Sequence, residues 1–308
     1  MKIGITGGAG FIGSNLVSLF TQKNFECKIF DNLETGDIKN LGDKQSEFMK
    51  GDLRDEKQVF DFIANVDYVI HLGALGSIPR SVENPRKSIE VNTLGTLNVM
   101  EAARKKDIPV IFSSSSSVYG RNSRQPKIEK DWAAPISPYA ASKLSAEAIV
   151  LSYQYIYGLT TTVFRFFNVF GPNQKADHVY SAVIPKWALA AFRKEPLLVF
   201  GDGEQIRDFT FVNDLCGTLF QNIEKQIMIP DPINLAFGNP ISLNNLLQLF
   251  KDYFGTLDIE YRENRKGDVK VSEADTTALY EIFGEQEITP IQNALEDTFK
   301  WIKKAYGF

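Results

Sequence analysis

Cysteine and histidine are scarce in this 308-residue sequence, which contains two of each. Cys27 and Cys216 are too few for a disulfide framework, and such usage is typical of the reducing cytosol, so we expect a cytoplasmic protein. His71 and His178 have no Cys or carboxylate neighbours at the spacing of metal ligands, which predicts that no metal is bound. The sequence also has no run of 18 apolar residues, so we expect no membrane span.

An excess of positive charge is missing as well. The chain has 34 Lys and Arg against 38 Asp and Glu, a net charge of −4, so no basic surface is expected to neutralise the phosphates of a nucleic acid. Apolar residues make up 44% and charged residues 23%, which is typical of a globular protein with a large core.

Glycines interrupt the apolar start of the chain from Gly7 onward, so we interpret it as part of the fold and not as a secretion signal.

Strand and helix patterns alternate through the first half of the chain. Short apolar segments are each followed by a segment whose apolar residues have helical spacing. We predict strands at 2–6, 27–31, 47–50, 66–72, 110–112 and 160–166, and helices at 11–20, 55–64, 85–106 and 137–157. Alternation of this kind is typical of right-handed crossovers between parallel strands, and it predicts an α/β, doubly wound parallel sheet of the Rossmann type.

After about residue 167 the alternation becomes less regular. Short strands at 197–200 and 208–212 are mixed with helices at 182–193, 242–254 and 290–305. We therefore predict two domains: a first at 1–167, and a second, smaller mixed α/β domain at 168–308. Residues 210–237 are expected to rejoin the first sheet.

A glycine-rich turn separates the first strand from the first helix. Gly7, Gly10 and Gly13 suit a tight turn, a close approach of the backbone to a pyrophosphate and close helix–sheet packing, each of which requires a missing side chain. The helix N-terminus then presents N–H groups to the phosphates. Asp31 ends the next strand, where a carboxylate accepts hydrogen bonds from a ribose and repels a 2′-phosphate. The pattern predicts NAD as the cofactor in preference to NADP.

A second group of residues suits acid–base chemistry. Tyr139 and Lys143 are four residues apart on a predicted helix, so both project from the same face. A lysine ammonium and a positive nicotinamide ring both favour a phenolate, although lowering a tyrosine pKa from about 10 by roughly three units requires about 4 kcal/mol. Five serines at 113–117 follow a strand at the carboxyl edge of the predicted sheet, where such folds bind ligands. A hydroxyl there would meet the substrate and the tyrosine together.

Motifs along nearly the whole chain resemble the extended short-chain dehydrogenase/reductase family. They are Thr-Gly-Gly-Ala-Gly-Phe-Ile-Gly at 6–13, Asp-Asn-Leu at 31–33, Gly-Asp-Leu at 51–53, Ser-Val-Tyr-Gly at 117–120 and Tyr139-x-x-x-Lys143. Phe-Phe-Asn-Val-Phe-Gly at 166–171 and Arg-Asp-Phe at 207–209 resemble the nucleotide-sugar epimerases within it. The resemblance implies an NAD-dependent isomerase whose first domain binds NAD and whose second binds a nucleotide sugar. It also implies a homodimer formed through helices 85–106 and 137–157.

The resemblance implies roles for individual residues. The matches to catalytic residues are Ser115, Tyr139 and Lys143. The matches to cofactor-binding positions are Gly7, Gly10, Phe11, Ile12, Gly13, Asp31, Asn32, Asp52, Leu53, Leu72, Ala74, Asn92, Tyr139, Lys143 and Phe166. The matches to substrate-binding positions are Ser77, Ser116, Ser117, Asn168, Val183, Phe200, Arg207, Arg265, Asp268 and Ser272. The two arginines suit a diphosphate, because each guanidinium presents paired N–H donors.

The resemblance also implies a reaction. The Tyr139 phenolate, assisted by Ser115, takes the proton of the sugar 4-hydroxyl while carbon 4 loses a hydride to NAD, and the hydride returns to the other face of the 4-keto sugar. Ser272 occupies a position where a bulky Tyr restricts some relatives to unacetylated sugars, so we expect UDP-GlcNAc and UDP-GalNAc to be interconverted, as in bacterial polysaccharide pathways. Residues 173–178 and Phe166 depart from the family pattern, and UDP-glucose and UDP-glucuronate remain alternative substrates.

Other activities fit the same residues less well. A 4,6-dehydratase needs an acid and a base where this chain has Ser115, Ser116 and Ser117, and hydroxyls do not perform that proton transfer near neutral pH. A UDP-uronate decarboxylase is expected to have a Glu in this loop, and a 4-ketoreductase would use NADPH, which Asp31 disfavours. A protein that only senses NAD or a nucleotide sugar would not need Ser115, Tyr139 and Lys143 together, although the fold alone does not decide this.

Overall fold

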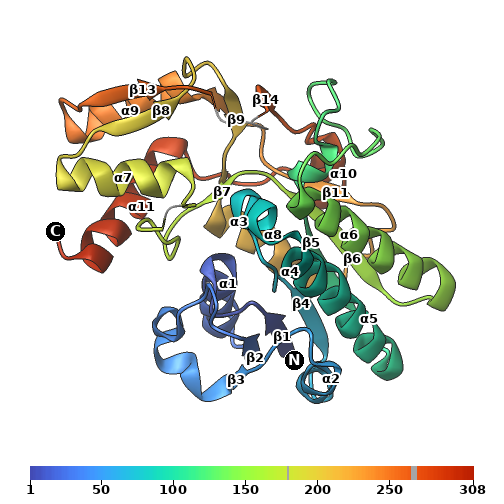
Figure 1. Ribbon diagram of the computed structural model, residues 1–308. Helices are drawn as coiled ribbons and strands as arrows, with labels where there is room; N and C mark the ends of the chain where they lie inside the picture. The colour runs from blue at the N-terminus through green and yellow to red at the C-terminus, as the bar shows by residue number, and fades with distance from the viewer. Residues whose placement is uncertain (179, 265–268) are drawn as a thin grey trace. The chain divides into compact units, whose positions relative to one another are not determined.

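The computed structural model describes residues 1–178, 180–264 and 269–308, with the side chains of all of these except residues 43–47. Its residues form two compact units (Figure 1). The first unit consists of Met1–Asn122, Trp132–Phe166 and Cys216–Ile233, and the second of Ser123–Asp131, Phe167–Leu215 and Asn234–Phe308. Every helix in the described part of the chain is too short or too polar to cross a membrane.

The largest sheet of the chain has seven strands in the order β11-β6-β5-β4-β1-β2-β3. The pairings among β1 to β6, which lie in the first unit, are all parallel. This order confirms the predicted doubly wound α/β fold of the Rossmann type. The strands are β1 (Lys2–Thr6), β2 (Glu26–Asp31), β3 (Phe48–Lys50), β4 (Tyr68–His71), β5 (Val110–Ser115), β6 (Thr161–Phe166) and β11 (Ile233–Leu235).

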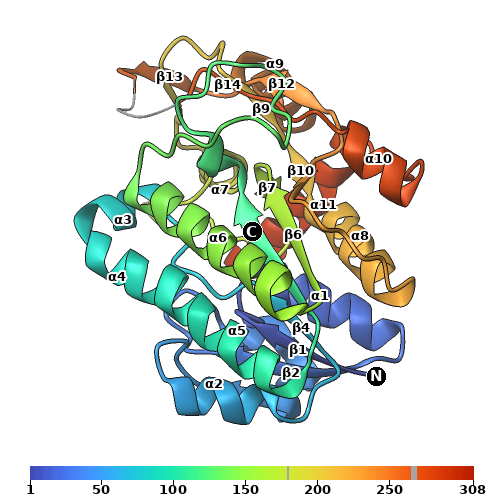
Figure 2. The same cartoon turned by 90° about the vertical axis from the view of Figure 1, so that its right-hand side faces the viewer.

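Helices cover the strands of the first unit. They are α1 (Phe11–Gln22), the 3₁₀ segment η1 (Ile38–Glu47), α2 (Glu56–Ile63), α3 (Ile78–Glu83), α4 (Pro85–Ile89), α5 (Gly95–Lys106), the 3₁₀ turn η3 (Ser116–Tyr119) and α6 (Pro138–Tyr157). Figure 2 shows α2, α5 and α6 side by side, and their buried side chains share one apolar core with β4, β5 and β6. Phe20 of α1 packs against Phe220 of α8 (Val212–Glu224), with ring centroids 5.4 Å apart.

The segment predicted as one helix at 85–106 is interrupted. Between α4 and α5 lies a short π-helical stretch, η2 (Glu90–Leu94), and such stretches occur frequently at functional sites. Within it, the Asn92 amide accepts the Leu75 backbone N–H at 2.7 Å and donates to Ser142 Oγ of α6 at 2.9 Å. The sequence pattern missed this change because a five-residue π segment hardly alters which face of the helix is apolar.

The described residues of the second unit form short strands and four further helices. β9 (Ile206–Asp208) pairs antiparallel with β12 (Pro240–Ser242) and parallel with β14 (Val271–Ser272). Two parallel pairs are formed by β8 (Leu197–Phe200) with β13 (Ile259–Arg262) and by β7 (Val169–Phe170) with β10 (Thr210–Phe211). The helices are α7 (Val183–Arg193), α9 (Leu243–Phe254), α10 (Thr277–Phe283) and α11 (Ile291–Tyr306).

An aromatic core holds α7, α9 and α11 together. Phe250 of α9 contacts Trp187 of α7 with centroids 5.7 Å apart, and Phe299 of α11 with centroids 4.9 Å apart. The strand predicted at 208–212 is divided, since β9 ends at Asp208, β10 covers two residues and α8 begins at Val212. Periodicity could not locate these breaks, because buried apolar runs of this length are compatible with either a strand or a helix.

Two glycines allow α1 to start directly against the turn that follows β1. Gly7 has a φ of +69°, and a methyl group added there would lie 2.8 Å from the Gly73 nitrogen. A methyl group on Gly13 would lie 2.3 Å from the Gly7 carbonyl oxygen and 2.6 Å from the Gly8 Cα. Because these neighbours are backbone atoms, neither position tolerates a side chain without a shift of the turn.

We predict that Gly13→Ala lowers the free energy of unfolding by about 1–3 kcal/mol, since the added carbon displaces the backbone of the turn. The measurement is urea denaturation followed by circular dichroism. Gly217→Ala is the matched control: Gly217 is an exposed position on α8, where an added methyl group meets no heavy atom within 4 Å. There the higher helix propensity of Ala makes the substitution neutral or stabilising. If both substitutions had the same effect, close packing at Gly13 would not constrain the turn.

Candidate active site

A pocket lies at the carboxyl ends of β1, β2 and β4. It is lined by Gly7, Phe30, Asp31, Asn32, Glu34, Thr35, Gly51, Asp52, Leu53, Gly73, Ala74, Leu75 and Val91. It therefore brings together six of the predicted cofactor-binding residues, which are Gly7, Asp31, Asn32, Asp52, Leu53 and Ala74. Beside it, α1 begins with Gly10 as its N-cap and without a side-chain cap, so the N–H groups of its first turn suit a phosphate. Apolar walls, carboxylates and a helix N-terminus together fit a dinucleotide.

The Asp31 carboxylate fixes the backbone around this pocket. Its Oδ2 accepts the N–H of Ala9 at 3.1 Å, and its Oδ1 accepts the N–H of Leu33 at 2.8 Å. The side chain thus links the glycine-rich turn to the loop after β2. The residue pattern predicts for Asp31 a ribose contact and repulsion of a 2′-phosphate but not this structural role, because hydrogen bonds between side chains and backbone groups leave no residue pattern. The ribose contact stays a prediction.

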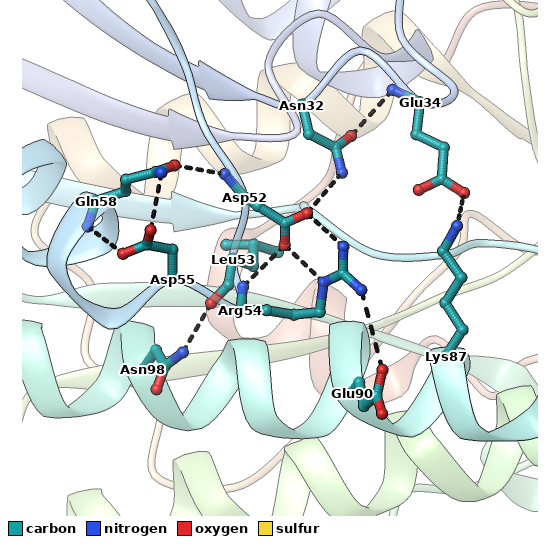
Figure 3. Close-up of polar contacts among 10 residues, drawn as sticks. All are labelled: Asn32, Glu34, Asp52, Leu53, Arg54, Asp55, Gln58, Lys87, Glu90 and Asn98. Atoms are coloured by element: carbon teal, nitrogen blue, oxygen red, sulfur yellow. Dashed lines mark hydrogen bonds and ion pairs between the residues drawn. The ribbon is translucent and has the colours of Figure 1, made fainter.

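Carboxylates neutralise two cations at the rim of the pocket (Figure 3). Arg54 donates to Asp52 from Nε at 2.9 Å and from Nη2 at 2.7 Å, and its Nη1 lies 3.9 Å from Glu90. The hydrogen bonds from Arg54 lower the pKa of Asp52 to about 2. Lys87 Nζ of α4 lies 2.6 Å from Glu34 Oε1. The rim therefore presents paired charges, whereas a 2′-phosphate requires cations that are available to it.

β5 and α6 bring the three predicted catalytic residues together. The Ser137 hydroxyl caps α6, and Tyr139 and Lys143 follow one helical turn apart. Ser115, the last residue of β5, acts on the phenol of Tyr139 and favours its ionised form by lowering its pKa. Ser115 Oγ also accepts a hydrogen bond from Ser117 Oγ at 2.9 Å, which fixes its rotamer.

Burial opposes charge on both Tyr139 and Lys143. It raises the pKa of Tyr139, and the influence of Ser115, which lowers that pKa, compensates only in part. The Lys143 ammonium lies 4.6 Å from the centre of the Phe112 ring and is almost fully buried. Burial lowers the pKa of Lys143 to about 7, against the opposing charge of Glu147. The residues of the chain alone therefore do not give the predicted lowering of the Tyr139 pKa. The sequence argument counted nearby cations but not the desolvation of both groups.

His71, at the end of β4, is a neutral side chain near Lys143. Its ring nitrogens are hydrogen-bonded to the hydroxyls of Thr6 at 2.7 Å and Thr96 at 3.0 Å. Complete burial, followed by the charge of Lys143, lowers its pKa to about 3. His71 therefore adds no positive charge that would compete with the Lys143 ammonium.

Other predicted residues of the first unit lie at the ends of elements. Ser77 caps α3 by accepting the Arg80 N–H, and Ser116 and Ser117 begin η3. Phe166, at the end of β6, pairs with Ser115 in the sheet register. Leu72 follows β4, and Phe11 and Ile12 form the first turn of α1. The contacts of Asn92 described above are with Leu75 and Ser142, so its side chain holds the pocket wall in place.

In the second unit, β9 gathers three predicted substrate residues. Ser272 of β14 lies opposite Arg207 of β9 in the parallel register. The Asn168 side chain donates to the Asp208 carbonyl oxygen at 3.0 Å. Sequence analysis missed Asp208 itself, a fully buried carboxyl that accepts the Asn239 N–H at 3.1 Å and whose pKa is raised to about 6 by burial. It joins β9 to the start of β12 and so fixes the strand that carries Arg207.

Two further predicted substrate residues also belong to the second unit. Val183 begins α7 and Phe200 ends β8, and the indole of Trp187 joins these elements by donating to the Leu198 carbonyl oxygen at 2.9 Å. Arg265 and Asp268 lie outside the described residues. Within the described part of the chain, no group of three or more His, Cys, Asp and Glu side chains is placed to hold a metal ion.

A glycine-rich turn between the first strand and helix of a parallel sheet, with Ser115, Tyr139 and Lys143 in the same unit, defines a Rossmann-type dinucleotide-binding enzyme. The model of the NAD dependent epimerase/dehydratase family matches residues 3–236. The chain belongs to this family, and its cofactor is NAD.

Individual relatives are similar over nearly the whole chain. The structure of UDP-N-acetylglucosamine 4-epimerase from Methanobrevibacter ruminantium M1, in complex with UDP-N-acetylmuramic acid, is 36% identical with a TM-score of 0.93, covering 99% of this chain and 98% of that one. The structure of the Thermus thermophilus UDP-glucose 4-epimerase complex with NAD is 28% identical with a TM-score of 0.90, and the match covers 99% of this chain and 100% of that one. UDP-glucuronate 4-epimerase of Thermodesulfobacterium geofontis is 30% identical over 317 residues, covering 97% of this chain and 95% of its own.

We predict that Glu34→Gln tightens NADP binding roughly fivefold, with less than a twofold change for NAD. The substitution removes the ion-pair partner of Lys87, so the ammonium becomes available to a 2′-phosphate, and an exposed charge pair is worth up to about 1 kcal/mol. Isothermal titration of protein freed of cofactor measures both dissociation constants. Glu296→Gln, which removes an exposed partner of Lys300 on α11, is the control. An NADP affinity that does not change would show that the Glu34–Lys87 pair plays no part in cofactor selection.

Proposed function

We propose that the chain catalyses the NAD-dependent 4-epimerisation of a UDP-sugar through a transient 4-keto intermediate. The observation that carries the proposal is the placement of three residues in the unit that contains the dinucleotide pocket: Ser115 at the end of β5, which acts on the Tyr139 phenol, and Lys143 one helical turn after Tyr139. The three relatives named above support it, since each bears the name of a 4-epimerase of a UDP-sugar.

In the proposed reaction Tyr139 moves the proton. Its phenolate takes the proton of the sugar 4-hydroxyl during oxidation at carbon 4 and returns it to the 4-oxygen during reduction from the other face. Ser115, which acts on the Tyr139 phenol, orients that oxygen. In its protonated form, Lys143 supplies a positive charge that favours the phenolate. When bound, NAD accepts and returns the hydride, and its oxidised ring adds positive charge. The cycle has no net redox change.

The serine segment favours epimerisation over dehydration. Expulsion of the sugar 6-hydroxyl requires an acid and a base near carbons 5 and 6. At this place the chain presents Ser115 and Ser117, hydrogen-bonded to each other, and Ser116 in the same turn. These hydroxyls can position an oxygen but do not titrate near neutral pH. A related dehydratase or reductase is therefore the weaker alternative.

As the substrate pair we propose UDP-GlcNAc and UDP-GalNAc. Ser272 lies opposite Arg207, which we assign to the diphosphate together with Asn168. The small side chain of Ser272 leaves room for a 2-acetamido group. We further assign Arg265 and Asp268 to the nucleotide, with Val183 and Phe200 near its base. The names of the Thermus and Thermodesulfobacterium relatives favour UDP-glucose and UDP-glucuronate as the second candidates.

The proposal extends to the assembly and its setting. We infer a homodimer formed through the helices of residues 85–106 and 137–157, working in the cytoplasm on a polysaccharide precursor. Large apolar side chains are exposed on these helices, among them Ile89, Leu94 and Ile156, which suits burial against a second copy.

The test is to incubate the purified protein separately with UDP-GlcNAc, UDP-glucose and UDP-glucuronate, without added cofactor, and to separate the products chromatographically. We expect the acetylated pair to interconvert. Tyr139→Phe, which keeps the ring and loses the proton carrier, is expected to lower kcat by roughly 10²–10⁴. Tyr155→Phe removes the same hydroxyl from an exposed position of the same helix and should leave kcat unchanged. If no sugar is inverted even with NAD supplied, the proposed activity is wrong.

A substitution of Ser272 tests the proposed preference for acetylated sugars in the same assay. Ser272→Tyr is expected to lower kcat/KM for the acetylated pair about tenfold or more, because the ring fills the space of the acetamido group, with little change for UDP-glucose. An equal change for both substrates would contradict the role of Ser272 in sugar selection.

A further inference from the structure

Four side chains form a buried polar network next to Tyr139 and Lys143. Arg165 of β6 and Glu147 of α6 form an ion pair through two contacts, Nη2 to Oε1 at 2.5 Å and Nε to Oε2 at 3.1 Å. Ser114 donates to Glu147 Oε2 at 2.5 Å, and Arg165 Nη1 donates to the Tyr119 phenol at 2.9 Å. Glu147 is 2% exposed and Arg165 is 6% exposed.

Each member of this network lies on an element that carries a predicted catalytic, cofactor-binding or substrate-binding residue. Ser114 directly precedes Ser115 in β5, and Arg165 lies opposite Ser114 in the parallel register. Glu147 follows Lys143 by one turn and Tyr139 by two turns along α6. Tyr119 ends the 3₁₀ turn that begins at Ser116. The network therefore ties β5, η3 and α6 to β6 in the first unit.

Stability alone does not account for a buried ion pair at this place. Removing two charges from water is costly, and replacing such a pair by apolar residues of similar volume is often neutral or stabilising. A fully satisfied network, in contrast, fixes the relative positions of its members, because any shift leaves a buried polar group unpaired. Here that constraint acts on the strand end and the helix that hold Ser115 and Tyr139.

The charge of Glu147 also acts on Lys143. The titratable groups near this ammonium are Tyr139 and Glu147 on its own helix and His71 on β4, with Arg165 of β6 beyond Glu147. His71 is neutral, so Glu147 supplies the negative charge that opposes the burial of Lys143. Arg165 holds that carboxylate in place from the other side.

We propose that Glu147 and Arg165 are positioning residues for the reaction: the buried pair fixes the end of β5 and helix α6, and with them Ser115 and Tyr139, relative to each other, and it places a carboxylate one helical turn from Lys143. The inference rests on the proposed roles of Ser115, Tyr139 and Lys143. Neither Glu147 nor Arg165 is assigned to substrate or cofactor.

The first test is Glu147→Gln, which keeps the shape and an acceptor for Ser114 but removes the charge. We expect kcat to fall at least about tenfold with KM for the UDP-sugar within twofold. The alkaline limb of the pH profile of kcat should move down by about one pH unit, because burial of Lys143 is then unopposed and its pKa falls. If Glu147 had a purely structural role, the substitution would lower the free energy of unfolding and leave the pH profile of kcat unchanged.

A double variant covers the case in which Glu147→Gln does not fold. Glu147→Leu with Arg165→Met removes both charges and leaves neither unpaired. We expect it to fold, to retain NAD, and still to show the lowered kcat and the shifted alkaline limb. Glu101→Gln is the control, because it removes a carboxylate of α5 that accepts hydrogen bonds from Arg104 and Tyr153. It should leave the pH profile of kcat unchanged.

Two results separate this inference from the proposed function. An active wild type, an inactive Tyr139→Phe variant and Glu147 variants with the wild-type kcat and pH profile would overturn the positioning role alone. A wild type that inverts no UDP-sugar would overturn both.

Discussion

The charge on one buried lysine governs the chemistry of this site. Lys143 lies against the Phe112 ring with almost no exposure, so burial favours its neutral form, and the same burial disfavours the phenolate of Tyr139. An ammonium and a phenolate at this place stabilise each other, whereas either one alone is unfavourable. In the proposed reaction, catalysis at neutral pH therefore depends on neighbours that favour the charged pair: Glu147 one helical turn from the lysine, and an oxidised dinucleotide that we place beside the tyrosine.

The fold provides these neighbours through the edge of one sheet. The parallel order of β1, β4 and β5 places the glycine-rich turn, His71 and the serine segment at the same carboxyl edge. The Asp31 carboxylate then fixes the turn against the loop after β2, and ion pairs neutralise the cations at the pocket rim. The cofactor selection and proton transfer that we propose thus depend on the same few strand ends.

Local patterns predicted much of the first unit, because they are properties of neighbouring residues. The alternating segments gave the doubly wound sheet, and the spacing of Gly7, Gly10 and Gly13 gave the turn. Features that depend on distant residues were not predictable. Glu147 and Arg165 are 18 residues apart, and nothing in the sequence distinguishes them from other charged residues of a helix and a strand. In the structure they form one buried ion pair. The energetic cost of burying Tyr139 likewise depends on what surrounds it, which no spacing reveals.

The central claim, that this site holds Tyr139 as a phenolate when NAD is bound, can be tested by ultraviolet difference titration of the NAD-loaded protein. The signal of the Tyr139→Phe variant is subtracted from that of the wild type, which isolates one phenol. We expect the phenolate to appear with a midpoint below about pH 8, and we expect this midpoint to rise above about pH 9 in a Lys143→Met variant. A wild-type midpoint at about pH 10 or higher would contradict it.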